Sequence, residues 1–215
     1  MSARGRQAPR RALAADRTGT AAIEFALLFP VMLTLFLGSY ELENYLLAYL
    51  KVTAAAETAA DLVAQTGISS GSAQDGVLAQ TDFDTFTSAT ANVLTPLPVG
   101  TNSSAVKIAF ASVTYSTGTP VIDWHVEENG ATPVTASNVP NNQSLANLGN
   151  AASGSTDSVI VVQVTYVYNS PLTYALGSSY TLSESAFNRP RYVNCVPSSA
   201  SGTHAATSDT NGQCP

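Results

Sequence analysis

An apolar stretch near the N-terminus constrains the fold of this 215-residue chain more than any other feature. Residues 20–40 read TAAIEFALLFPVMLTLFLGSY, and Glu24 is the only charged residue among them. An α-helix needs about 20 apolar residues to span the hydrocarbon layer of a membrane. The charge-free part, residues 25–40, is shorter than this, so Glu24 has to lie near the interface or be paired. We therefore expect a transmembrane helix over residues 20–40.

Basic residues cluster on one side of this stretch. Residues 1–19 hold five of the nine Lys and Arg residues and a single acid, whereas the rest of the chain holds four bases and fourteen acids. Positively charged segments stay on the cytoplasmic side of a membrane. The asymmetry thus predicts a cytoplasmic basic leader over residues 1–19, a single pass through a bacterial inner membrane, and a periplasmic remainder. A chain this acidic repels phosphate backbones, so we expect no nucleic-acid partner.

Apolar residues continue at helical spacing beyond the membrane segment. No Gly or Pro interrupts residues 39–66, so one helix is predicted from about Thr20 to Gln65, roughly 68 Å long at 1.5 Å per residue. Residues 41–66 would form a periplasmic extension that packs one apolar stripe on a soluble domain. The expected stripe consists of Leu42, Tyr45, Leu46, Tyr49, Leu50, Thr53, Ala56, Ala60 and Val63.

Residues 67–215 are expected to form a periplasmic, mostly β domain. A short helix is predicted over residues 82–94. The alternating and β-branched segments that follow predict a hairpin of two strands, then a central strand and a last strand, at residues 106–115, 121–126, 159–168 and 180–192. The predicted fold class is α+β: a long N-terminal transmembrane helix that continues onto a small antiparallel β-sheet domain of pilin-like shape.

Both cysteines, Cys195 and Cys214, lie near the C-terminus. The predicted compartment is oxidising, and paired cysteines there usually form disulfides. Closing a loop of about 20 residues stabilises a fold by roughly 3 kcal/mol in the chain-entropy model. We expect a C-terminal disulfide loop rather than a metal site, because His204 is the only other histidine or cysteine nearby.

The most specific local motif is RTGTAAIEF at residues 17–25. A basic leader ends in Gly19, and Glu24 follows five residues later at the head of the apolar helix. This arrangement resembles the prepilin-peptidase site of type IV pilin-like proteins. The longer stretch at residues 17–45, RTGTAAIEFALLFPVMLTLFLGSYELENY, resembles the TadE-like family of tight-adherence (Flp) pilus pseudopilins and assembly proteins. Residues 184–191, ESAFNRPR, look like the C-terminal segment of that family.

The resemblance implies that a prepilin peptidase cuts between Gly19 and Thr20, and that Glu24 acts in assembly with other pilus or pseudopilin subunits. A carboxylate in an apolar membrane helix is costly unless it is paired, and the new ammonium of Thr20 would lie one helical turn away. The alternative is that Glu24 merely reaches the lipid interface. Pro30 should kink the helix, because it leaves the carbonyl of Ala26 without its N–H partner.

Three motifs could indicate a hydrolase, a metal site or a signal-peptidase site, but their context argues against each. Residues 67–71, GISSG, match a hydrolase pattern, but that pattern needs a strand before it and a helix after it. Asp123, His125 and Glu127 alternate on a predicted strand, and a solvated strand face is favoured over a metal site. Residues 54–56 lie too far past the apolar core to be a signal-peptidase site. We therefore expect no enzyme activity, no cofactor and no metal.

The predicted function is structural. The chain would be a minor pseudopilin or a membrane-anchored assembly component of a tight-adherence pilus. The alternative is an envelope-anchored periplasmic binding module or adhesin that does not enter a filament. That alternative needs the membrane anchor, but it needs neither Gly19 nor Glu24.

Overall fold

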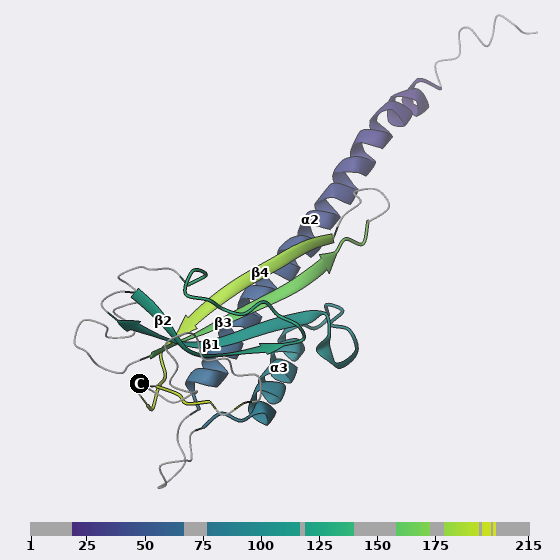
Figure 1. Ribbon diagram of the computed structural model, residues 1–215. Helices are drawn as coiled ribbons and strands as arrows, with labels where there is room; N and C mark the ends of the chain where they lie inside the picture. Colours follow the sequence, from purple (N-terminus) through teal and green to yellow (C-terminus); the bar gives the residue numbers. More distant parts are fainter. Residues whose placement is uncertain are drawn as a thin grey trace, which may run out of the picture. The chain divides into compact units, whose positions relative to one another are not determined.

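The computed structural model describes residues 19–66, 77–116, 119–139, 158–172, 179–193, 195–198 and 200. Helix α2 (Thr20–Ala64) comes first, followed by helix α3 (Gln80–Leu94) and the 3-10 turn η1 (Thr101–Ser103). Four strands complete the order (Figure 1): β1 (Val106–Ser116), β2 (Thr119–Glu128), β3 (Ser158–Asn169) and β4 (Ser179–Asn188). The predicted α+β class, with a long N-terminal helix and a small antiparallel sheet, is confirmed.

The chain divides into two compact units, Met1–Glu43 and Asn44–Pro215. The first unit contains the N-terminal half of α2, and the second contains its C-terminal half together with α3 and the sheet. Helix α2 ends one residue before the predicted position. Its last carbonyl, on Ala64, accepts a hydrogen bond from the backbone N–H of Arg191 at 2.9 Å, so the helix end is satisfied by a distant segment.

The sheet has the strand order β2-β1-β3-β4, and every pairing is antiparallel. The predicted hairpin of the first two strands and the predicted central position of β3 are both confirmed. β4 ends at Asn188 rather than at Tyr192, two residues before Pro190, which cannot donate to a strand ladder.

The hairpin contains one irregularity. Ser112 pairs with Trp124, but the next residue of β1, Val113, pairs with Ile122. Asp123 is therefore the extra residue of a β-bulge. A bulge breaks the strict alternation of side chains along a strand, and this decides where Asp123 points.

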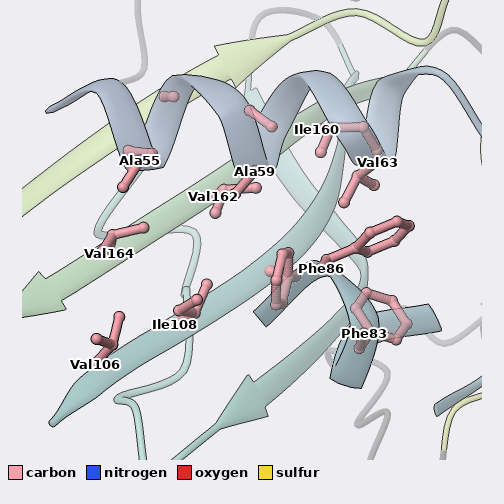
Figure 2. Packing of buried hydrophobic residues seen from close by; sticks show 14 of the residues in the cluster. Ala55, Ala59, Val63, Phe83, Phe86, Val106, Ile108, Ile160, Val162 and Val164 are labelled. Carbon is pink, nitrogen blue, oxygen red and sulfur yellow. The ribbon is translucent and has the colours of Figure 1, made fainter. Parts of the chain in front are cut away.

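The main core lies between the helices and one face of the sheet. Figure 2 shows Ala55, Ala59 and Val63 of α2 lying over Ile160 and Val162 of β3, and all five side chains are fully buried. Helix α3 adds two phenylalanines next to them, of which Phe83 contacts Phe110 at a centroid distance of 5.2 Å and Trp124 at 5.6 Å. The short helix predicted over residues 82–94 is present as α3, which begins two residues earlier and buries Phe83 and Phe86.

The stripe predicted for the second half of α2 is correct in part and wrong in part. Ala56, Ala60 and Val63 are buried as expected, but Leu46 and Leu50 are 48% and 63% exposed. The face that packs on the sheet is made largely of small residues: Ala48, Val52, Ala55, Ala56, Ala59, Ala60 and Val63. The sheet surface already carries bulky β-branched side chains, so close packing leaves room only for small residues on the helix.

Candidate membrane anchor and assembly segment

The N-terminal half of α2 has apolar side chains on all its sides, and within the described part of the chain none of them is buried. Ile23, Phe25, Leu27 and Phe36 are each at least 60% exposed. By length and composition this helix can cross a membrane. A helix that is apolar all round needs lipid or other helices around it. This single N-terminal helix is consistent with single-pass membrane anchoring.

Gly19, the residue before the predicted cleavage, lies in a turn immediately before α2. Its carbonyl accepts the hydrogen bond from the N–H of Ile23 at 3.2 Å and so takes part in the first turn of the helix. A Cβ added at this position would meet nothing within 4 Å, and the φ angle lies outside the left-handed region that favours glycine. The fold therefore does not itself require a glycine at this position.

Glu24 is exposed and lies four residues after Thr20, the first residue of α2. Residues four apart share one face of a helix, so the start of α2 and the carboxylate of Glu24 lie on the same side. The first helical turn contains no acid. Pro30 lies inside α2, which continues on both sides of it; the predicted kink stays a prediction.

The prediction of a solvated face for Asp123, His125 and Glu127 is wrong. Asp123 is only 4% exposed, and the side chains of His125 and Glu127 are 12% and 17% exposed and contact each other through Nδ1 and Oε1. The bulge also separates the three residues. His125 and Glu127 pair with Ala111 and Ala109, which lie in a small second cluster on the face away from the helices.

Asp123 instead turns toward two hydroxyl groups of β1. Its Oδ2 accepts hydrogen bonds from Ser112 Oγ at 2.9 Å and from Thr114 Oγ1 at 2.8 Å. Burial raises the pKa of Asp123 from 3.8 to about 6, and the two hydroxyl bonds partly oppose this shift. Among the described residues, no group of three His, Cys, Asp or Glu side chains could hold a metal ion.

The sequence did not indicate how the segment before the C-terminus is held. The indole Nε1 of Trp124 donates to the carbonyl of Val196 at 2.6 Å, and the N–H of Leu78 donates to the carbonyl of Pro197 at 2.9 Å. Cys195 is buried beside them. Cys214 lies outside the described residues, as do the basic leader before Gly19 and the GISSG motif, and the predicted disulfide stays a prediction.

Comparison with known proteins identifies one similarity, and it falls on the anchor helix. Residues 19–61 match the family model described as TadE-like protein, which is the family that this segment was predicted to resemble. No curated protein and no solved structure matches the chain. The match begins at Gly19 and takes in Glu24, Pro30 and most of α2, but not the sheet. The chain therefore carries a TadE-like segment at residues 19–61, which supports a part in the assembly of tight-adherence (Flp) pili.

Proposed function

We propose that the protein is a minor pseudopilin, or a membrane-anchored assembly component, of a tight-adherence pilus. In this proposal residues 20–40 cross the bacterial inner membrane, the basic leader is cytoplasmic, and the sheet domain is periplasmic. The observation that carries the proposal is the uncovered apolar half of α2, which has one carboxylate near its start and matches the TadE-like family. The protein acts by contacts within and outside the membrane and catalyses no reaction.

We further propose that a prepilin peptidase cuts the chain after Gly19. The position of Gly19 supports this, because it lies in the turn immediately before α2 and a cut after it would leave Thr20 as the first residue of the helix. Cleavage leaves an ammonium group on Thr20, four residues before Glu24 and on the same face of the helix. The two charges can then pair, within one chain or between neighbouring chains.

The decisive experiment is a measurement of the mature N-terminus by mass spectrometry of protein from intact cells. Processing predicts a chain that begins at Thr20. Gly19→Arg should leave a longer, unprocessed form, whereas Ala14→Arg adds the same charge within the leader and should leave processing intact. A full-length chain in the wild type would exclude processing and would favour an anchored component with its leader retained.

The role of Glu24 is tested separately by Glu24→Ala. This change makes the helix more apolar, so membrane insertion should be preserved, while piliation should fail because the carboxylate is lost. Glu24→Asp keeps the charge and is the matched control, with piliation retained in part. Normal pili with Glu24→Ala would exclude the pairing role and would favour the envelope-anchored binding module or adhesin.

Topology is tested with a reporter fused to the C-terminus. An enzyme reporter that works only in the periplasm should be active in the fusion. A reporter that works only in the cytoplasm should be silent, and its activity there would overturn the proposed orientation.

A further inference from the structure

The two edges of the sheet differ in their ability to accept another strand. β2, at one edge, contains Pro120 and the bulge at Asp123, and both features hinder the addition of a further strand. β4, at the other edge, pairs with β3 through ten consecutive residues without a register shift, and it contains no proline. A regular edge strand presents a row of unpaired N–H and C=O groups to its open side.

A cavity of about 630 Å³ runs beside β4. One wall comes from α2, through Thr53, Ala56, Glu57, Thr58 and Asp61, and the other from residues 184–188 of β4. Successive side chains of a strand point to opposite faces, yet five consecutive β4 residues line this cavity. The residues of β4 that face away from α2 can reach this cavity through their backbone, which borders the open edge of the sheet. We name this space the α2–β4 groove.

The charges in the α2–β4 groove define the partner that fits it. Glu57 and Asp61 lie one turn apart on α2, and Glu184 faces them from β4. Arg191 pairs with Asp61, so Glu57 and Glu184 leave the groove negative overall. A second copy of this chain is a poor occupant, because the part after the leader holds fourteen acids and only four bases. Charge complementarity points to a basic partner.

We propose that the α2–β4 groove binds an extended, basic segment of a partner protein, which adds a fifth strand at β4 and places Lys or Arg side chains against Glu57 and Glu184. In strand addition, main-chain hydrogen bonds supply affinity and alternate side chains supply specificity. Glu184 lies on the strand and Glu57 on the helix flank, so an incoming strand meets carboxylates on its helix-facing side. This proposal does not depend on a role in pili, since none of its residues lies in the membrane segment.

The binding test uses the full-length protein in a non-ionic detergent and a fluorescent ten-residue peptide of alternating threonine and arginine. The reference peptide alternates threonine and glutamate. The basic peptide should bind, and its affinity should fall as salt is added. The acidic peptide should not bind. Glu57→Gln and Glu184→Gln should each weaken binding about two- to fivefold. Asp84→Asn removes the same charge from the exposed face of α3 and should leave the affinity unchanged.

Hydrogen exchange distinguishes strand addition from simple charge attraction. Bound basic peptide should slow amide exchange in residues 179–188, and circular dichroism should show that each variant keeps the wild-type fold. The proposal is overturned if both peptides bind equally, if the double Gln variant binds as tightly as the wild type, or if protection falls outside β4. Concentration-dependent dimerisation that protects β4 would assign the edge to a second copy and would likewise overturn it.

Discussion

The guanidinium of Arg191 pairs with the carboxylate of Asp61, and the backbone N–H of the same arginine donates to the carbonyl of Ala64. These contacts join the segment after β4 to the end of α2, although Asp61 and Arg191 are 130 residues apart in the sequence. Asp61 is the last residue of the TadE-like match, and Arg191 ends the ESAFNRPR segment. The TadE-like segment thus meets the ESAFNRPR segment in space.

The ion pair should nevertheless contribute little to stability. The side chains of Arg191 and Asp61 are 53% and 38% exposed, and exposed pairs are typically worth about 0.2–1 kcal/mol. Arg191→Ala also keeps the backbone bond to Ala64. A double-mutant cycle with Asp61→Asn, measured by denaturant unfolding in detergent, should give a coupling energy below about 1 kcal/mol. A coupling of several kcal/mol would show that the pair is a main support of the fold.

Enlarging the small-residue face of α2 should destabilise the domain. Ala59 is fully buried against β3 (Figure 2), so Ala59→Leu forces extra atoms into a filled core at a cost of about 1–3 kcal/mol. Ala54 lies on the same helix but outside the core cluster, so Ala54→Leu should change the unfolding free energy much less. Equal effects in thermal unfolding would contradict the packing observed here.

Removing the indole N–H of Trp124 should loosen the segment at residues 195–198. Trp124→Phe leaves the buried carbonyl of Val196 without its 2.6 Å partner, and an unsatisfied buried acceptor costs about 1–3 kcal/mol. We expect a lower unfolding free energy and faster protease cleavage near Val196. Tyr192→Phe, at a side chain that is 58% exposed, is the control and should behave as the wild type.

Asp123 should make the domain less stable as the pH rises. Its pKa is about 6 in the folded state against 3.8 ordinarily, so between these values the folded state holds a proton that the unfolded state has released. The unfolding free energy should therefore fall from pH about 4 to pH about 7, by on the order of 3 kcal/mol for this group.

Asp123→Asn removes the titration of this carboxyl and isolates its contribution. The difference between wild type and Asp123→Asn in unfolding free energy should itself change with pH, in the direction that favours the wild type at low pH. A pH-independent difference for Asp123→Asn would contradict the raised pKa.

Cys195 and Cys214 should be bonded to each other in protein taken from intact cells. Cys195 is buried, and the proposed periplasmic location is oxidising. Non-reducing peptide mapping should recover one cross-linked peptide pair that separates on reduction. Recovery of both residues as free thiols would contradict the pairing and would weaken the case for a periplasmic domain.

Structural elements that depend on a short run of residues were predicted well from the sequence. The charge-free apolar stretch predicted the first half of α2, and the absence of Gly and Pro after it predicted that the helix continues. The β-branched run at residues 159–168 predicted a central strand, and the structure places β3 there. Each of these follows from burial and local backbone preference alone. The motif around Gly19 and Glu24 likewise predicted the TadE-like match at residues 19–61, because that match depends on adjacent residues.

Other features depended on contacts between distant segments, and only the tertiary structure decided them. The face of α2 that packs on the sheet holds the alanines rather than the larger leucines, because the bulk of β3 limits the depth available. The β-bulge turns Asp123 away from His125 and Glu127. Ile122 and Trp124 both stay paired with β1, so the extra residue between them does not follow the alternation of side chains between the two faces of the sheet. The α2–β4 groove lies between residues 53–61 of α2 and residues 184–188 of β4, which are far apart in the sequence. A local pattern carries no information about such pairings, since they are set by which surfaces fit together once the chain has folded.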